Sequence, residues 1–406
     1  MVKRSAPLSE DSNPIINLNG EFMKSNPRFF IFGYFGWFNA GDDAIGLSVI
    51  KELKTRYPDA TFAVTCNDRY FLENFRDSNI SCDLEIIGFE ILEIIREVIK
   101  SDYFVITGGT HFHDEDGLNY GRFKILLNFV MLTHFARLLR KSPLLLGHGI
   151  GPLSSSWSKA LVKVILYNSK IILVRDEDSF ELVTSLGFGE KCIQGFDCTA
   201  TLIEASPVLS GVAHHQSEQR IIGVSLLSVY SIYSNDVEKD INIVKSLARC
   251  LESVLLNDNS IRLRLFAFRT GMRHSDVPPL EALMKNMNVR PDAIELVHYD
   301  GDVRNFLSSI EECDYCVGMR YHASVFAYLL HKPQIILDYM GKCKSLGRDI
   351  AIDEAAIVPI TKILAPEFCG KIQSFLLNPD QYIANYPVHS AKMRTEKMFE
   401  KLEEEL

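Results

Sequence analysis

The feature of the sequence that most constrains its fold is a regular alternation of short apolar runs with helix-length segments, which begins at residue 28. The runs are hydrophobic at nearly every position, which is typical of parallel strands covered by helices on both faces. The first half of the chain therefore predicts a doubly wound α/β sheet. Its expected strands are residues 28–34, 61–65, 103–107, 144–147, 171–174 and 192–194, and its expected helices are residues 42–53, 89–99, 122–140, 158–168 and 178–186.

The alternation stops at a polar stretch, residues 206–219, whose Pro, Gly, His and Gln content is typical of a linker, and then starts again. Strands are expected at residues 220–225, 262–266, 293–297, 315–317 and 334–337, with helices at 236–255, 279–287, 303–310 and 323–330. The expected parts are an N-terminal arm (1–27), an N-terminal α/β domain (28–205), the linker (206–219), a C-terminal α/β domain (220–378) and a C-terminal segment (379–406) with a charged helix at 390–404. Ligands of such sheets bind beyond the carboxyl ends of the strands, which here is a cleft between two domains.

Composition and charge exclude some classes of function. Lys and Arg total 43 against 52 Asp and Glu, a net charge of -9, which argues against a broad basic surface for nucleic acid. No apolar core of a secretory signal follows the first residues, and residues 125–139, the most apolar stretch, are too short and too polar to span a bilayer. A local cationic pocket for a small anion remains compatible with the composition.

Cysteine usage points to a reducing compartment. The nine cysteines are an odd number spread thinly along the chain, which fits thiols better than a disulfide framework. Cys313 and Cys316 have the spacing of a redox or metal pair, but no second pair or neighbouring His cluster completes a zinc site, so buried thiols on a strand are favoured. We therefore expect a cytoplasmic protein.

The loop after the first expected strand, residues 33–43 (GYFGWFNAGDD), is rich in glycine and aromatic residues. Glycines allow a tight turn and close approach to a ligand, and Asp42 can cap the helix that follows. The loop matches neither the dinucleotide fingerprint nor the P-loop. Aromatic side chains on such a loop resemble a surface on which a sugar stacks. The residues expected to bind an acceptor here are Gly36, Trp37, Asn39 and Asp42.

Two further strand ends in the first half carry histidines. Residues 107–116 (TGGTHFHDED) follow one strand, and His113 and Asp114 in this loop are candidates for acid–base catalysis because histidine titrates near neutrality. A metal site at His111, His113 and Asp114 is an alternative, although no further ligand of an obvious type is evident at a distant position in the sequence. His148 ends the next strand, where it either lines the acceptor pocket or plays a structural role.

In the second half, residues 318–324 (GMRYHAS) end a strand and open directly into a helix. Backbone N–H groups at a helix N-terminus favour an anion, and an arginine adds a bidentate donor for carboxylate or phosphate. We therefore expect Arg320 and His322 to be catalytic and to bind an anionic donor. The other residues expected to bind this donor are Gly318, Arg269, Arg273 and Lys342, although an arginine facing solvent is the alternative for each cation.

Taken together, these strand ends resemble those of the polysaccharide pyruvyl transferase family, in the same order and at similar spacing, from about residue 29 to about residue 350. The segments that carry the resemblance are residues 33–43, 107–110, 147–152, 174–179 with 186–187, 195–197 and 318–323. The resemblance implies two Rossmann-like domains of the GT-B type that face a cleft, with no metal or other cofactor. It also implies transfer of a pyruvyl group from phosphoenolpyruvate to two hydroxyls of one sugar, which forms a ketal and releases phosphate.

The resemblance further implies partners and roles. The donor would be phosphoenolpyruvate, bound by Arg320 and His322 in the C-terminal domain, and the acceptor a glycan or a lipid-linked oligosaccharide presented by the N-terminal domain. His322 would supply a proton or bind the phosphate, and His113 or Asp114 would act as base. Nucleic acid is not an expected partner, whereas peripheral association with a membrane and a homo-oligomer are left open.

The sequence departs from the family's pattern at three places. The arginine that usually follows the strand at residues 222–225 is replaced by leucine, so Arg269 or Arg273 is expected to take its role. Tyr321 stands where Leu is common, and His148 where Gln is frequent. Two other functions stay open: a nucleotide-sugar glycosyltransferase, with Asp300 or Glu311 on the ribose, and a glycan-binding homologue without activity.

Overall fold

The computed structural model describes residues 26–76, 84–114, 119–203, 219–271 and 274–406. They form two domains, each built on a wholly parallel sheet, with strand orders β3-β2-β1-β4-β5-β6-β7 and β10-β9-β8-β11-β12-β13. The first sheet contains β1 (Arg28–Phe35), β2 (Thr61–Cys66), β3 (Leu84–Ile87), β4 (Tyr103–Thr107), β5 (Leu144–His148), β6 (Ile171–Val174) and β7 (Cys192–Gln194). The second contains β8 (Arg220–Ser225), β9 (Ile261–Ala267), β10 (Ile294–His298), β11 (Tyr315–Gly318), β12 (Gln334–Asp338) and β13 (Ile357–Pro359). The predicted pair of doubly wound α/β domains is confirmed.

The helices of the N-terminal domain are α1 (Ala40–Arg56), α2 (Glu73–Arg76), α3 (Ile91–Lys100), α4 (Tyr120–Leu138), α5 (Ser156–Asn168) and α6 (Glu177–Ser185). Those after β8 are α7 (Val229–Tyr233), α8 (Val237–Asn257), α9 (Val277–Lys285), α10 (Val303–Glu311), α11 (Tyr321–Leu329), α12 (Lys342–Asp349), α13 (Glu367–Leu377) and α14 (Val388–Glu404). Every expected strand and helix is present within a few residues. The elements that sequence analysis missed are β3, β13, α2, α7, α12 and α13.

The strand order of both sheets reverses direction beside the first strand of each domain. In the N-terminal sheet this point lies between β1 and β4, and in the C-terminal sheet between β8 and β11. Helices leave such a point in opposite directions and open a crevice at the carboxyl ends of the strands. The two crevices face each other, so the loops after β1, β4, β9 and β11 all meet between the domains.

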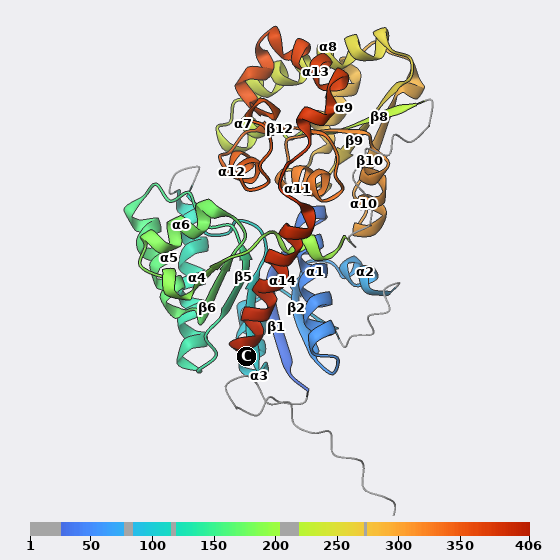
Figure 1. Cartoon of the computed structure of the whole chain (residues 1–406). Helices are drawn as coiled ribbons and strands as arrows, with labels where there is room; N and C mark the ends of the chain where they lie inside the picture. Colours follow the sequence, from blue (N-terminus) through green and yellow to red (C-terminus); the bar gives the residue numbers. More distant parts are fainter. Residues whose placement is uncertain (1–25, 77–83, 115–118, 204–218, 272–273) are drawn as a thin grey trace, which may run out of the picture.

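The C-terminal helix, α14, leaves the C-terminal domain and runs back over the N-terminal domain (Figure 1). Met398 of this helix packs on Gly195 after β7, where a Cβ atom would lie only 2.3 Å from the methionine side chain. Thr395 is fully buried and its hydroxyl donates to the Asp197 carbonyl at 3.2 Å. The charged helix expected at residues 390–404 therefore completes the core of the N-terminal domain.

The domains also touch directly beside β1 and β9. The Ala40 backbone N–H donates to the Phe268 carbonyl at 2.9 Å, across the domain boundary. Asp43, in the first turn of α1, is fully buried and accepts from the hydroxyl of Tyr70 at 2.7 Å and from that of Tyr299, in the other domain, at 2.9 Å. The contact between domains thus contains a buried carboxyl held by two tyrosines.

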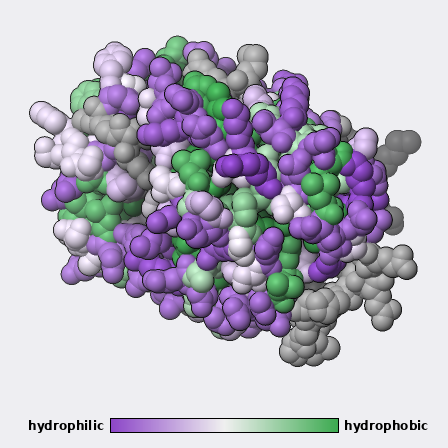
Figure 2. Space-filling model, turned by 90° about the horizontal axis from the view of Figure 1, so that it is seen from above, coloured by the Kyte–Doolittle hydropathy of each residue, from purple (hydrophilic) through white to green (hydrophobic). Residues whose placement is uncertain are grey.

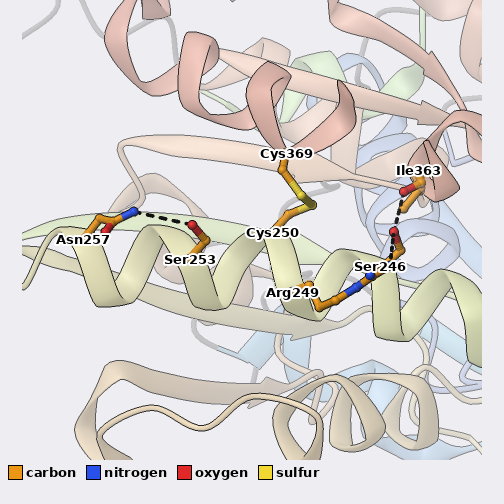
Figure 3. Close-up of a disulfide and its surroundings, with 7 residues drawn as sticks. All are labelled: Ser246, Arg249, Cys250, Ser253, Asn257, Ile363 and Cys369. Atoms are coloured by element: carbon orange, nitrogen blue, oxygen red, sulfur yellow. Dashed lines mark hydrogen bonds between the residues drawn. A yellow bond between two sulfur atoms is a disulfide. The ribbon is translucent and has the colours of Figure 1, made fainter. Parts of the chain in front are cut away.

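A disulfide joins Cys250 of α8 to Cys369 of α13 (Figure 3). Next to it, the Ser246 hydroxyl donates to the Ile363 carbonyl at 2.7 Å, so α8 is tied twice to the segment around α13. This pairing differs from the expectation of reduced thiols and removes one ground for expecting a reducing compartment. Cys313 and Cys316 are buried free thiols, as expected.

Among the described residues, no helix is long and apolar enough to cross a membrane. Figure 2 looks down on the C-terminal domain and shows a mostly hydrophilic surface broken by small hydrophobic patches. The expected arm and the linker at 206–219 fall almost entirely outside the described residues.

The buried carboxyl of Asp43 predicts a pH-dependent stability. Burial raises its pKa from 3.8 to about 7, against the hydrogen bonds it accepts. The folded protein therefore holds this proton to higher pH than the unfolded chain, so the stability that Asp43 contributes is lost as the pH rises through this range. We therefore expect the free energy of unfolding of Asp43→Asn, taken relative to that of the wild type, to rise by about 3 kcal/mol between about pH 5 and about pH 8.

The measurement is chemical denaturation at both pH values. Asp59→Asn, at an exposed carboxylate after α1, is the matched control and should follow the wild type. Parallel pH profiles for Asp43→Asn and the wild type would contradict the prediction.

Candidate functional site

A cavity of about 830 Å³ opens between the two domains at the carboxyl ends of the strands. Tyr34, Trp37 and Phe38, from the end of β1 and its loop, form an aromatic wall. The C-terminal domain contributes Arg269 and the residues that follow it. The cavity is also lined by Asp42, Asn67, Gly109, Thr110, His111, Arg122, Ile125, Thr270, Gly271 and His274.

His322 reaches across the domain boundary to the first turn of α1. A Cβ atom on Gly41 would lie only 2.1 Å from the His322 Nδ1 atom, so only glycine admits the ring at this distance. On its other side, the Nε2 atom lies 3.5 Å from a carboxylate oxygen of Asp197, which follows β7 of the N-terminal domain. The imidazole is therefore fixed between two elements of the opposite domain.

Asp197 is held as a carboxylate. It is 1% exposed, accepts from Arg175 at 3.0 Å and accepts from both the hydroxyl and the backbone N–H of Thr199. Burial alone would raise its pKa, but His322, Arg175 and Thr199 outweigh burial and hold the pKa well below its usual range. A fixed negative charge therefore lies behind His322, on the side of the ring away from Gly41.

Arg175 links this carboxylate to the C-terminal domain. Its guanidinium lies 3.9 Å from the ring centre of Tyr321 and donates to the Thr110 hydroxyl at 3.2 Å. The departure from leucine at position 321 therefore has a physical role, because the tyrosine ring supplies a cation–π contact across the domain boundary.

Asp42 lies in the first turn of α1 and lines the cavity. The expectation that Asp42 caps this helix is wrong: the cap is Asn39, whose side chain accepts from the Gly41 backbone N–H at 3.3 Å and donates to Asp42 at 2.5 Å. Burial raises the pKa of Asp42, while His322 and Arg269 oppose the shift. A carboxyl with a raised pKa that lines the cavity is a candidate for proton transfer with a ligand.

Arg269 supplies a buried cation on the opposite wall. Its side-chain Nε is shielded from solvent and has no hydrogen-bond partner in the described part of the chain. Burial and the neighbouring Arg320 lower its pKa. Leu226 and Leu227, after β8, are buried apolar residues, whereas Arg269, after β9, lines the cavity.

Arg320 is anchored by an internal carboxylate. Its Nε lies 3.1 Å from both oxygens of Asp276, which is fully buried, and its Nη2 donates to the same residue and to the His274 carbonyl. Asp276 also accepts from the Arg269 backbone N–H at 3.0 Å. One buried carboxylate therefore positions both arginines, and Arg320 does not itself line the cavity.

The remaining donor-side residues differ in their placement. Lys342, at the start of α12, lies near enough to Asp42 and His113 to lower the pKa of each. Gly318 is buried at the end of β11, where a Cβ atom would lie 3.2 Å from the Ser324 hydroxyl. Arg273 lies outside the described residues.

The two residues expected to act as base have other environments. Both oxygens of Asp114 accept backbone N–H groups, from Ser154 and Ser155, and these bonds outweigh burial and lower its pKa. Burial first, then Arg122 and Lys342, lowers the pKa of His113 to about 3. An imidazole with so low a pKa is a poor base, and neither residue lines the cavity.

The expected acceptor residues also divide. Trp37 and Asp42 line the cavity, whereas Asn39 acts on Asp42 and Gly36 forms a turn with φ +72°. His148 is fully buried and its Nε2 lies 3.0 Å from the Ile106 carbonyl. Burial lowers its pKa to about 4, so this histidine is a neutral core residue. It does not line the cavity.

Sequence reasoning placed Arg175 and Asp197 in matching segments but gave them no role, and it missed Asp276. The first two follow β6 and β7 and could have been found by listing every charged residue at a strand end. Asp276 lies at the start of α9, 44 residues from Arg320, and no local pattern links the pair. No group of three or more His, Cys, Asp or Glu side chains in the described ranges is placed to hold a metal ion.

Comparison with known protein families matches residues 39–340 to the family described as polysaccharide pyruvyl transferase. No curated protein matches the sequence. The match contains the loops after β4 and β9, both of which line the cavity.

Among solved structures, the UDP-GlcNAc 2-epimerase of Neisseria meningitidis, bound to UDP-GlcNAc, is similar at 13% identity and a TM-score of 0.57, over 92% of this chain and 99% of its own. HepE of Anabaena, in complex with UDP-glucose, is similar at 14% identity and a TM-score of 0.57, over 93% of this chain and 99% of its own. The UDP-GlcNAc 2-epimerase of Methanocaldococcus jannaschii is similar at 11% identity and a TM-score of 0.57, over 92% of this chain and 99% of its own. At these identities the likeness shows the fold, two Rossmann-like domains of the GT-B type.

The contact between Gly41 and His322 predicts that Gly41→Ala inactivates the site. The added methyl group would overlap the imidazole and push His322 away from Asp42 and Asp197, so we expect a loss of activity of about 100-fold or more. Gly370→Ala on α13, where nothing lies within 4 Å of the added atom, is the matched control.

The readouts are melting temperature and turnover. A Gly41→Ala variant with wild-type turnover would show that the close approach of the ring is unimportant.

Proposed function

Since the chain belongs to the polysaccharide pyruvyl transferase family, we propose that it transfers the pyruvyl group of phosphoenolpyruvate to two hydroxyls of one sugar. The product is a pyruvate ketal on a polysaccharide or on its lipid-linked precursor, and phosphate is released. The observation that carries the proposal is the pairing, in one cavity, of an aromatic wall with Arg269, whose Nε is shielded from solvent and has no hydrogen-bond partner in the described part of the chain.

The two walls suit the two substrates. Aromatic side chains such as Tyr34 and Trp37 pack against the apolar face of a sugar ring. Phosphoenolpyruvate carries a carboxylate and a phosphate, which need fixed cations rather than a broad basic surface. Arg269 offers a charge on the cavity wall whose Nε has no hydrogen-bond partner among the described residues, and Arg320, held by Asp276, lies beside it.

The chemistry needs two proton movements. Protonation of C3 of the enol makes C2 electrophilic, one sugar hydroxyl attacks C2 and loses its proton, and phosphate leaves. The second hydroxyl then attacks the same carbon. The two sugar hydroxyls lose one proton each. Over all the steps, one of these protons is added to the new methyl group and the other leaves with phosphate, so atoms and charge balance.

We assign the proton donor to His322 and the base to Asp42. The carboxylate of Asp197 holds the imidazole of His322 against the first turn of α1, the turn that carries Asp42, and the imidazole would give a proton to the donor or to its phosphate. The raised pKa of Asp42 makes it a stronger base than an ordinary carboxylate, and it lines the cavity. This assignment replaces His113, whose pKa is too low for a base, and Asp114, whose two oxygens already accept backbone N–H groups.

A nucleotide-sugar glycosyltransferase is the rival function, because two of the similar structures, those from Neisseria meningitidis and Anabaena, were solved with UDP-sugars. Asp300 and Glu311, the residues expected to hold a ribose, are exposed and do not line the cavity. Thermal shift separates the two functions: phosphoenolpyruvate should raise the melting temperature, and UDP should not. Stabilisation by UDP alone would favour the rival.

The deciding experiment measures phosphate release from phosphoenolpyruvate with and without a panel of sugar acceptors. His322→Ala should lower turnover by about 10²- to 10⁴-fold, because it removes the proton donor, while the melting temperature changes little. His331→Ala, in the turn after α11, is the matched control. Unchanged phosphate release in His322→Ala would remove the assignment, and no release with any acceptor would favour a binding protein.

Arg269→Gln tests the anion site. Loss of a charge-assisted contact should raise KM for phosphoenolpyruvate about 10- to 100-fold with a smaller change in kcat. Arg304→Gln, at an exposed arginine on α10, should leave both constants unchanged. An unaltered KM in Arg269→Gln would place the donor elsewhere.

A further inference from the structure

Two neighbouring helices of the N-terminal domain, α4 and α5, lie in a segment with an unusual charge pattern. Residues 119–170 contain no Asp and no Glu, although the whole chain has a net charge of -9. The cations of this segment are Arg122, Lys124, Arg137, Arg140, Lys141, Lys159, Lys163 and Lys170. The next helix, α6, is acidic at its start, so the basic segment ends at its boundary.

The outer face of α4 is apolar as well as basic. Tyr120, Leu127, Met131 and Leu138 share one side of the helix at spacings of 7, 4 and 7 residues and are 83%, 36%, 55% and 71% exposed. The opposite side is buried in the core of the domain. No described residue therefore covers this apolar stripe, and Lys124 lies within it.

The outer face of α5 continues the pattern. Trp157, Val164 and Tyr167 are 66%, 39% and 59% exposed on one side of the helix, and Lys159 and Lys163 lie beside them. The two helices lie side by side at the edge of the N-terminal domain (Figure 1). The Arg137 guanidinium, from α4, lies 4.5 Å from the ring centre of Tyr167 and joins the two stripes. We call these outer faces of α4 and α5 the basic apolar face.

The two ends of α4 lead to cavities. Arg122 and Ile125, near its start, line the candidate site. Near its end, a hollow of about 500 Å³ is lined by Arg137, Arg140, Lys141 and Lys170, with Asp102 and Glu405 as its carboxylates. The basic apolar face thus extends from the mouth of the site to a cationic hollow of the size of a small headgroup.

We propose that the basic apolar face docks on an anionic lipid membrane. Exposed Trp and Tyr side chains prefer the membrane–water interface, and lysines around an apolar stripe are attracted to anionic headgroups. A protein partner is a poorer fit, because protein interfaces are depleted in lysine. Docking would hold the mouth of the cavity at the membrane surface, where a lipid-linked acceptor would lie. The docking itself does not depend on the proposed function.

The first test is binding to vesicles of phosphatidylcholine, with and without phosphatidylglycerol. We expect the protein to sediment with the anionic vesicles only and to be released by salt, because salt screens the attraction. Trp157 is one of two tryptophans in the chain, so in Trp37→Phe its fluorescence reports on α5 alone. A blue shift on anionic vesicles would place this side chain in the interface.

Variants separate the contributions of charge and apolar area. Lys159→Glu with Lys163→Glu should weaken vesicle binding more than tenfold, since each cation near an anionic surface strengthens binding about fivefold. Met131→Ser with Trp157→Ser should weaken binding while keeping the charge. The matched control is Leu256→Ser with Leu377→Ser, at exposed leucines of α8 and α13 in the other domain, and it should bind as the wild type does.

Three results would overturn the proposal. They are failure of the folded wild type to bind anionic vesicles, equal binding to neutral and anionic vesicles, and a dimer that the Met131→Ser and Trp157→Ser changes convert to a monomer. The last would assign the face to a second copy of the chain. Phosphate release with a soluble acceptor, measured on the same variants, reports on the proposed function separately.

Discussion

The close approach of His322 to the first turn of α1 is the constraint on which the rest of the site depends. It requires glycine at position 41, a carboxylate behind the imidazole at Asp197, and a fixed distance between the domains. The buried contact of Asp43 with Tyr299 and the stacking of Arg175 on Tyr321 set that distance. The site is therefore a property of the closed pair of domains, and neither domain holds it alone.

Much of the fold could be predicted because the parallel strands are short, apolar at most positions and separated by helix-length segments. Strands 103–107, 171–174, 192–194 and 220–225 match the structure residue for residue. The missed elements carry weak signals: β3 is a short edge strand that contains Glu85, β13 has only three residues, and α12 is polar with a glycine inside it. Edge strands and surface helices are fixed by tertiary contacts more than by local pattern.

The candidate site could be predicted in part. Strand ends located His322, Trp37 and Arg269, because topology brings those ends together whatever their side chains do. Sequence could not tell which polar side chains face the cavity. It therefore predicted His148 in the acceptor pocket and Asp114 as a base, although His148 is enclosed by the core and Asp114 accepts backbone N–H groups of a loop. Nor could it show that Asp276 engages Arg320, since that pairing forms only when the fold brings the start of α9 to the start of α11.

The path of α14 has a consequence for how the molecule moves. The chain passes from the N-terminal domain to the C-terminal domain after residue 203 and returns just before Val388, so two covalent connections join the domains. A pair of tethers permits rotation about the line through both far more readily than sliding or free twisting. Opening to admit substrate should therefore be a rotation of one domain about the line through the two connections, which separates the aromatic wall from Arg269 along one path. A tag fused after α14 would lie on the N-terminal domain.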